Sequence, residues 1–372
     1  MTEPTHRLLA LAAPQIGDLK PYLPGKPISE LERELGISGS VKLASNENPL
    51  GCGEAARAAY LAAAGELGRY PDGGGFALRA AIAAHHGLMA EQVTLGNGSN
   101  DVLDQIARAF LYPGRESVFS EHAFAVYPIA TTAVGAIARV ASARDYGHDL
   151  EAMAALVSAR TGVVWIANPN NPTGTWIAAE PLRAFLCALP ERCIAVVDEA
   201  YFDYVEEPQY PDTSTWLDRF PNLIVTRTFA KIHGLAALRV GYGLSHPAVA
   251  ELLNRVRQPF NVNAPAQAAA VAALADHAHV RRSRAHNRAE LARVGEGLRA
   301  LGLAPIPSVG NFVTVDLGRP AGPIDQALLR AGVICRPVAN YGLPQHLRIS
   351  IGLASENDRL LATLAAVLKR CD

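Results

Sequence analysis

Cysteine is scarce in this sequence, which has five among 372 residues, an odd number without regular spacing. Disulfide frameworks need paired cysteines and zinc sites need closely spaced ones, so the scatter argues against both. We expect reduced thiols, as in a cytoplasmic protein, and no bound metal. The five are Cys52, Cys187, Cys193, Cys335 and Cys371.

The sequence also lacks an excess of charge of either sign. Its 34 Lys and Arg residues nearly balance 35 Asp and Glu residues, which gives a formal net charge of −1. This balance gives no electrostatic reason to expect nucleic acid or an anionic membrane as a partner. No apolar run reaches the roughly 20 residues that span a bilayer, and the N-terminus shows no signal-peptide cleavage pattern. We therefore expect a cytoplasmic location.

A third absence concerns cofactor motifs. No G-x-G-x-x-G opens a strand–helix–strand unit, which argues against a nicotinamide-dependent oxidoreductase.

What is present is a large apolar content, with 49% hydrophobic and 19% charged residues over a chain longer than one typical core. We expect one large domain and a smaller one.

Strand-like and helical stretches alternate through most of the chain. This alternation predicts an α/β fold with a mainly parallel sheet and helices on both faces. The strand-like stretches are 93–95, 117–119, 136–140, 163–167, 194–197 and 223–226, with helices expected near 54–66, 76–86, 102–110, 125–134, 150–158 and 179–189. Helices at 246–257 and 264–301, the second interrupted, lead to a smaller α+β unit from about residue 304.

Polar loops follow several of these strands. Residues 168–174, residues 198–201 and the segment around Lys231 each come after a strand, at the edge where parallel sheets bind ligands. Residues 96–101 place two glycines between a strand and a helix, where backbone N–H groups can converge on an anion. A tight connection without a ligand is the alternative interpretation.

Lys231 has apolar neighbours, and Arg239 follows eight residues later. Burial favours the neutral amine, which can attack an aldehyde and hold it as a Schiff base. Arg239 and the Thr228 hydroxyl can donate to a phosphate on the same ligand. Pyridoxal 5′-phosphate carries both groups and needs an acid partner for its ring nitrogen. A surface lysine with a structural arginine is the alternative.

Asp198 ends an apolar strand, as either a helix cap or a carboxylate directed at a cation. An ionised Asp keeps a pyridine nitrogen protonated, which preserves the electron sink. Tyr201 can place its hydroxyl near the ring oxygen, and Asn171 can donate an amide N–H to it. Asp198, Tyr201 and Asn171 could each have an ordinary structural role instead. Their order along the chain, taken together with the lysine segment, is a highly specific combination.

The sequence resembles the fold-type I pyridoxal-phosphate aminotransferases, and most closely the histidinol-phosphate aminotransferases. The motifs that carry the resemblance are Asn-Pro-Thr-Gly at 171–174, Asp-Glu-Ala-Tyr at 198–201 and the Lys231 to Arg239 segment, and it extends from Tyr22 to Ser350. It implies a large domain with a mainly parallel sheet of the seven-stranded type and a small α+β domain. We expect an N-terminal arm and part of the small domain at 1–46, the large cofactor-binding domain at 47–280 and the small domain at 281–372.

The resemblance also assigns roles. Lys231 is the Schiff-base lysine and general acid/base, Asp198 binds the ring nitrogen, and Tyr201 and Asn171 contact the ring oxygen. Phe124 stacks on the ring. The residues assigned to the cofactor phosphate are Ser99, Asn100, Thr228 and Arg239, joined by Tyr70 from the neighbouring subunit of a homodimer with shared sites.

Substrate-binding residues are implied in the same way. Arg348 binds the α-carboxylate, Arg336 and Tyr22 receive the substrate phosphate, and Asn48 completes the set. Two positions depart from the family pattern: Ala230 stands where serine usually precedes the lysine, and Glu121-His122-Ala123 replaces a Pro-Thr/Ser turn. Both departures bear on phosphate affinity and on the detail of the substrate pocket.

The expected activity is histidinol-phosphate:2-oxoglutarate transamination in histidine biosynthesis. Within the same scaffold, the alternatives are an aromatic amino acid aminotransferase and a threonine-phosphate decarboxylase. From another class, a regulatory protein that holds the cofactor without catalysis is opposed by the intact lysine, aspartate and carboxylate-binding arginine.

Overall fold

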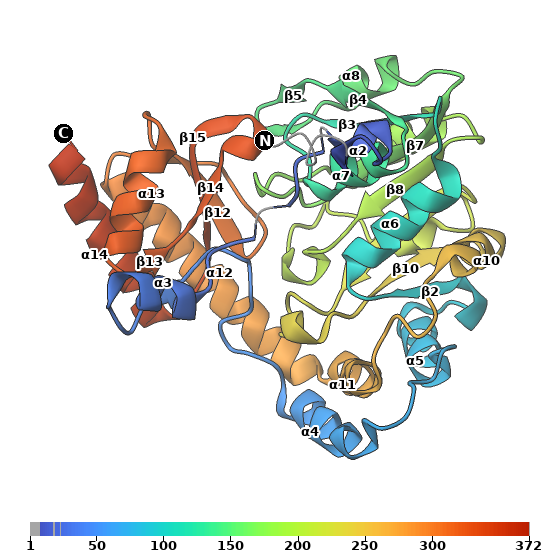
Figure 1. Cartoon of the computed structure of the whole chain (residues 1–372), viewed down its shortest axis with the longest axis horizontal. Coiled ribbons are helices and arrows are strands. Elements are labelled where there is room, and N and C mark those ends of the chain that lie inside the picture. The colour runs from blue at the N-terminus through green and yellow to red at the C-terminus, as the bar shows by residue number, and fades with distance from the viewer. Residues whose placement is uncertain (1–7, 18, 23, 372) are drawn as a thin grey trace.

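The computed structural model describes residues 8–17, 19–22 and 24–371. They form a larger lobe around one sheet and a smaller lobe that carries the C-terminus, as Figure 1 shows. The long helix α12 (His277–Ala300) begins beside the larger lobe and ends in the smaller one.

A seven-stranded sheet forms the centre of the larger lobe, in the order β2-β10-β9-β8-β7-β3-β4. All neighbouring pairs are parallel except those of β10, which runs antiparallel to both β2 and β9. Six of the seven strands therefore run one way, which confirms the predicted sheet. The strands are β2 (Val93–Gly96), β3 (Glu116–Ser120), β4 (Ile137–Ala141), β7 (Thr161–Ala167), β8 (Ile194–Asp198), β9 (Leu223–Thr228) and β10 (Gly241–Ser245).

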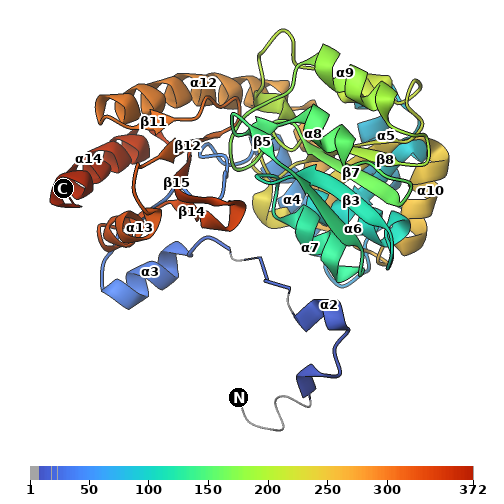
Figure 2. The ribbon, with the colours of Figure 1, turned by 90° about the horizontal axis from the view of Figure 1, so that it is seen from above.

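Every residue of β7 is buried, because helices cover both faces of the sheet. Alternate β7 residues belong to two different cores: Val164 and Ile166 pack on one face, and Val163 and Trp165 on the other. Buried residues of α8 and α9 join the first core and those of α6 and α7 the second, on opposite sides of the sheet in Figure 2. The helices of this lobe are α4 (Glu54–Ala63), α5 (Phe76–His86), α6 (Ser99–Phe110), α7 (Val126–Ala133), α8 (Leu150–Ala155), α9 (Ala179–Ala188), α10 (Pro247–Val256) and α11 (Ala264–Ala275).

The smaller lobe contains a four-stranded antiparallel sheet in the order β11-β12-β15-β14. Its core combines apolar residues of this sheet with residues of three helices, and Leu43 joins it from the N-terminal segment. The elements are β11 (Ala304–Pro305), β12 (Phe312–Asp316), α13 (Ala321–Arg330), β13 (Val333–Ile334), β14 (Arg336–Val338), β15 (Leu343–Ser350) and α14 (Ala354–Cys371).

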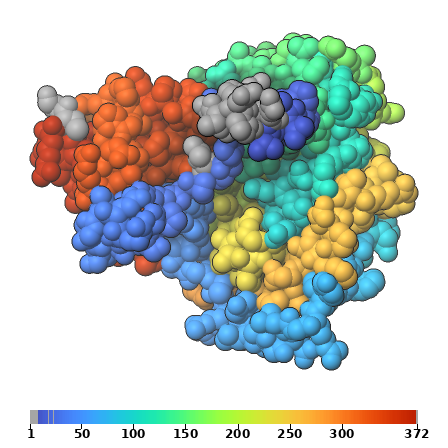
Figure 3. Space-filling view, viewed as in Figure 1, coloured from blue at the N-terminus to red at the C-terminus, as the bar shows by residue number. Residues whose placement is uncertain are grey.

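The N-terminal segment crosses the junction between the lobes (Figure 3). Helix α2 (Pro14–Gly17) contacts α7 of the larger lobe. Helix α3 (Ile28–Leu35) ends at Gly36, whose φ of 64° suits glycine, and strand β1 (Val41–Lys42) pairs with β13. A short hairpin of β5 (Ala143–Arg144) and β6 (Gly147–His148) completes the strands.

Among the elements that differ from the sequence-based expectations, two lie beside the predicted phosphate end of the site. Helix α6 begins at Ser99, three residues before the expected start, and β10 was not expected because Gly241 and Gly243 are poor strand formers. The structure explains these glycines: a Cβ on Gly241 would lie 2.4 Å from the Ser99 nitrogen, and one on Gly243 2.9 Å from Val102 Cγ1. The N-terminal end of α6 can approach the sheet only because both side chains are missing.

Candidate active site

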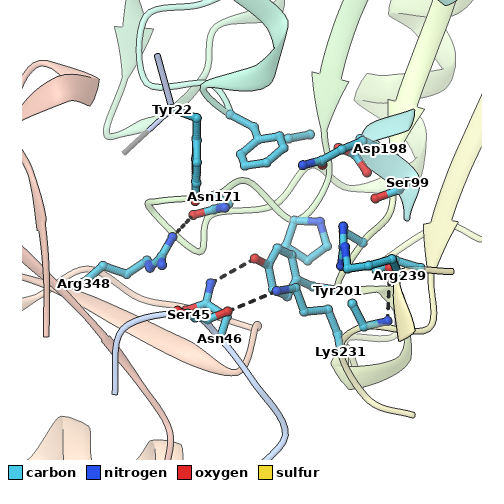
Figure 4. A pocket seen from close by; sticks show the side chains of 17 residues that line it. Tyr22, Ser45, Asn46, Ser99, Asn171, Asp198, Tyr201, Lys231, Arg239 and Arg348 are labelled. Carbon is cyan, nitrogen blue, oxygen red and sulfur yellow. Dashed lines mark hydrogen bonds between the residues drawn. The ribbon is translucent and has the colours of Figure 1, made fainter. Parts of the chain in front are cut away.

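A cavity of about 190 Å³ lies between the lobes, at the carboxyl ends of β7, β8 and β9. Its walls contain side chains from Tyr22 near the N-terminus to Arg348 on β15, so segments far apart in the sequence meet here (Figure 4). All of the residues predicted for the site line this cavity except Asn48, Tyr70 and Arg336.

Lys231 lies in the turn after β9, and its Nζ donates to the Ser45 main-chain carbonyl at 3.3 Å (Figure 4). Burial, together with the nearby cationic Arg348, lowers the pKa of this amine to about 7. Near neutral pH a large fraction of the amine is therefore unprotonated and nucleophilic.

Asp198 is the last residue of β8 and is almost completely buried. Its carboxylate accepts hydrogen bonds from Thr226 Oγ1 at 2.9 Å and Tyr127 Oη at 3.0 Å. Burial raises the pKa of Asp198, while these two hydrogen bonds oppose the rise. Sequence reasoning missed both partners, because the register that pairs Asp198 with Thr226 exists only in the folded sheet.

Arg348 on β15 reaches across the lobe junction to Asn171, with its Nη1 2.6 Å from Asn171 Oδ1. Its Nη2 donates to the Ala44 carbonyl at 2.6 Å. Among the described residues, its buried Nε has no hydrogen-bond partner. A buried guanidinium with an unmet donor beside a cavity is suited to bind an anion.

Asn46, for which the sequence predicted no role, lies at the cavity, whereas Asn48, predicted to bind substrate, does not line it. Asn46 lines the cavity, and its Nδ2 donates to Tyr201 Oη at 2.9 Å. Asn48, predicted to bind substrate, instead donates to the Ile232 carbonyl at 2.7 Å and Ser283 Oγ at 2.9 Å. These hydrogen bonds hold Asn48 against the turn next to Lys231, so its side chain is not part of the cavity wall. Two asparagines two residues apart in a turn cannot be told apart from sequence, because the side-chain directions depend on the fold.

One end of the cavity is built for an anion. Ser99 and Asn100 form the first turn of α6 and line the cavity with Arg239. A Cβ on Gly98 would lie 2.4 Å from Arg239 Nη2, so the guanidinium packs directly against this glycine. Helix N-terminal N–H groups and an arginine together favour a phosphate. Thr228 also lines this region, and its Oγ1 accepts from the Ala230 main-chain nitrogen at 3.1 Å.

Arg336 and Tyr70 lie outside the cavity wall. Arg336 on β14 pairs in register with Arg348, and its guanidinium carbon is 5.6 Å from the ring centroid of the cavity-lining Tyr22. Tyr70 is 83% exposed and stacks on Phe260, with ring centroids 4.7 Å apart. Phe124 lines the cavity.

A buried ion network that sequence reasoning missed lies directly behind the site. Arg227 donates to Glu199 Oε2 from Nε at 2.9 Å and from Nη2 at 2.7 Å, and to Asp212 Oδ1 at 2.6 Å. Its guanidinium carbon lies 3.5 Å from the ring centroid of Phe202. Arg227 follows Thr226, and Glu199 follows Asp198, so this pair joins β8 and β9 beside the carboxylate in the cavity.

We expect Glu199→Gln to lower the free energy of unfolding by about 3–5 kcal/mol, since it leaves the Arg227 charge buried without its main counterion. Urea unfolding of the cofactor-free protein measures the change. The matched control is Glu251→Gln, which removes an exposed pair with Arg255 and should leave stability nearly unchanged. Equal midpoints for both variants and the unaltered protein would contradict a stabilising role.

Comparison with known proteins places this site in a family. The aminotransferase class I and II family matches residues 38–364. This protein belongs to that family. The chain is similar to histidinol-phosphate aminotransferase 2 of Pseudomonas aeruginosa, with 59% identity over 97% of this chain and 98% of the relative. It is also similar to histidinol-phosphate aminotransferase 1 of Nitrosococcus oceani, with 53% identity over 96% and 97% of the two chains.

Solved structures agree with the family assignment. The structure of histidinol-phosphate aminotransferase from Sinorhizobium meliloti, in complex with pyridoxal-5′-phosphate, is 32% identical with a TM-score of 0.90 and covers 98% of this chain and 99% of that one. The fold is shared more widely, as with aspartate aminotransferase from Thermus thermophilus, which has a TM-score of 0.83 at 22% identity. In the described part of this aminotransferase, no helix has the length and apolarity to cross a membrane, and no three His, Cys, Asp or Glu side chains are grouped to hold a metal.

Proposed function

We propose that this aminotransferase uses pyridoxal 5′-phosphate to transfer an amino group between histidinol phosphate and 2-oxoglutarate, in histidine biosynthesis. The observation that carries the proposal is the meeting of Lys231, Asp198 and Arg348 at one cavity. Relatives named histidinol-phosphate aminotransferase that match nearly the whole chain support the choice of substrate.

The residues present fit this cofactor. Ser99, Asn100 and Arg239 line one end of the cavity with donors for a phosphate, and a side chain on Gly98 would displace the Arg239 guanidinium from this position. Lys231 supplies an amine with a pKa of about 7, and Asp198 supplies a buried carboxylate that also faces the cavity. When bound, the cofactor supplies an aldehyde for the amine and an electron sink for the substrate carbon.

Each residue then has a distinct task. Lys231 would move the proton between the substrate Cα and the cofactor carbon that carried the aldehyde, which an amine titrating near neutral pH can do efficiently. Asp198, fixed by Tyr127 and Thr226, holds the ring nitrogen in its protonated form. Asn171 and Tyr201 donate to the ring oxygen, and Phe124 packs against the ring.

Arg348 binds the α-carboxylate of glutamate or 2-oxoglutarate, the substrates of the proposed reaction that carry one. Its unpartnered Nε and its Nη1, which now donates to Asn171, present donors for a two-pronged contact with a carboxylate. Arg336 and Tyr22 lie beside Arg348 and bind the phosphate of histidinol phosphate, which occupies the place of a carboxylate on that substrate.

We expect Arg336→Ala to lower kcat/KM for histidinol phosphate by about 10- to 100-fold, because hydrogen bonds to a charged group contribute about 1.5–3 kcal/mol. The loss with phenylalanine should be small, since phenylalanine has no phosphate. Steady-state kinetics with both amino donors measure the difference, and Arg330→Ala, an exposed residue of α13, is the control. Equal losses with both donors would favour an aromatic amino acid aminotransferase.

We further propose a homodimer with shared sites, in which Tyr70 reaches the cofactor phosphate of the partner. The region around Tyr70 supports this, because it exposes several large apolar side chains that a monomer would leave in water. They are Leu61, Leu67, Tyr70, Phe76 and Phe260.

The location and the domain division are also proposals. We propose a cytoplasmic enzyme with an N-terminal arm and part of the small domain at 1–46, a large domain at 47–280 and a small domain at 281–372. Leu43 in the smaller core and the pairing of β1 with β13 support joining the N-terminal segment to the small domain.

A single-turnover absorption measurement tests which amino donor the enzyme prefers. The cofactor-loaded protein is mixed with histidinol phosphate and separately with phenylalanine, and the loss of its visible absorption band is followed. Rapid loss with histidinol phosphate alone supports the proposal. Comparable rates with phenylalanine indicate a broad aromatic aminotransferase, and the absence of a band would overturn the cofactor assignment.

A further inference from the structure

Asn46 makes several hydrogen bonds at the edge of the cavity. It is 1% exposed and has a φ of 55°, a conformation that asparagine tolerates better than most residues. Its Oδ1 accepts from Ser350 Oγ at 2.9 Å, and its main-chain nitrogen donates to the same Ser350 oxygen at 2.7 Å. Its main-chain carbonyl accepts from Asn311 Nδ2 at 2.9 Å.

In the structure, the Asn46 amide is oriented with its oxygen toward Ser350 and its nitrogen toward Tyr201, which satisfies the Ser350 proton. Because Ser350 Oγ accepts from the main chain, its proton is free to bond Asn46 Oδ1. The amide nitrogen therefore faces Tyr201 Oη, 2.9 Å away, as a donor (Figure 4). Tyr201 Oη acts as the acceptor in this contact, so its own proton is not used there.

The proton of Tyr201 is left for a ligand. Within residues 8–17, 19–22 and 24–371, no acceptor bonds to it, while the Tyr201 side chain lines the cavity. The ring is held by an edge contact with Phe312 at 5.1 Å between centroids. If residue 46 presented an acceptor, the hydroxyl would turn its proton toward that residue and away from the cavity.

We propose that Asn46, held by Ser350, is a positioning residue that directs the Tyr201 hydroxyl proton toward the ring oxygen of the cofactor. The inference rests on the proposed function and adds a residue that acts through Tyr201. Ser350 lies two positions after Arg348 on β15, so the strand that carries the carboxylate-binding arginine also fixes the donor to the ring oxygen.

A donor at the ring oxygen stabilises its negative charge. In the loaded enzyme, the Lys231 nitrogen is joined to the same ring system. The donor therefore makes the proton on this nitrogen easier to remove. Loss of that donor should raise the pH at which this nitrogen loses its proton. The other charged groups around Lys231 are Arg348, Glu47, Arg239 and Asp198, and Tyr341 lies near Tyr201; none of them is altered in the variants below.

The test uses Asn46→Asp in the cofactor-loaded enzyme. Aspartate keeps the size and the backbone preference of asparagine, but it replaces the N–H donor with an acceptor, so the Tyr201 proton is drawn away from the cavity. We expect the pH midpoint of the visible absorption change to rise by about one unit, as for the loss of one hydrogen bond to a charged group. Ser350→Ala, which adds no charge, should shift the midpoint in the same direction by a smaller amount.

A double-variant cycle separates positioning from the added charge of aspartate. In the Tyr201→Phe background, Asn46→Asp should shift the midpoint little further, because the hydroxyl through which it acts is gone. An undiminished shift of the midpoint in the Tyr201→Phe background would overturn the inference. It would also be overturned if Asn46→Asp and Ser350→Ala both had the same midpoint as the unaltered enzyme. Absence of a visible band in the unaltered protein would overturn the proposed function itself, and this inference with it.

Discussion

Replacement of Lys231 by alanine is expected to lower the rate of transamination by at least about 10⁴-fold, because the variant loses both the nucleophilic amine and the general base. Among the described residues that line the cavity, Lys231 is the only lysine. Nζ is the amine that lines the cavity, and its pKa of about 7 results from burial and from the charge of Arg348. Stopped-flow measurement of each half-reaction gives the rate, with Lys20→Ala, an exposed lysine outside the cavity, as the control.

The Lys231→Ala variant should still bind the cofactor without a covalent bond. Asp198, Arg239 and the start of α6 remain in place, and they contact the cavity independently of the lysine. Equilibrium dialysis separates loss of binding from loss of chemistry. A variant that keeps the full rate of turnover would refute the proposed role of Lys231.

Asp198→Asn has the second-largest expected effect, a decrease of about 10²–10³-fold in the rate of the first half-reaction. A neutral amide cannot hold the ring nitrogen protonated, so the charge that develops on the substrate carbon is less well stabilised. The fold should tolerate the change, because burial already raises the pKa of Asp198 and its side-chain partners are the hydroxyls of Thr226 and Tyr127.

Rapid mixing measures the Asp198→Asn rate, and thermal unfolding of the cofactor-free protein checks that the variant folds. Asp218→Asn, an exposed position in the larger lobe, is the matched control. An unchanged rate for Asp198→Asn in a folded, cofactor-loaded enzyme would contradict a role for its charge.

Much of the larger lobe could be predicted because its signals are local. The buried strands β7, β8 and β9 are short apolar runs bounded by turn residues, and α5 ends at Gly87 as expected. The interruption in the long helical stretch was also predicted, and Asp276 explains it by capping α12 through the His279 nitrogen at 2.9 Å. A parallel sheet brings the loops after its strands to one edge, so Asp198 and Lys231 could be expected to lie close together.

Other features had no local signal. The sequence of β10 contains two glycines that disfavour a strand, and only the approach of α6 explains them. Tyr127 and Thr226 look like ordinary core residues until the sheet register and the packing of α7 place them on Asp198. Arg227 and Glu199 are 28 positions apart, and nothing along the chain pairs them.

The sequence by itself determined the chemistry of this protein, because the lysine, the aspartate and the arginines are the functional groups that an amine-transfer site needs. It also determined most of the strands and helices of the larger lobe, β10 excepted, because these depend on near-neighbour patterns. Only the tertiary structure decided that Asn46, rather than Asn48, faces Tyr201, and that Arg348 contacts Asn171 from the other lobe. Side-chain direction and partners depend on contacts between residues more than 150 positions apart, and these contacts exist only when both lobes have folded and packed together.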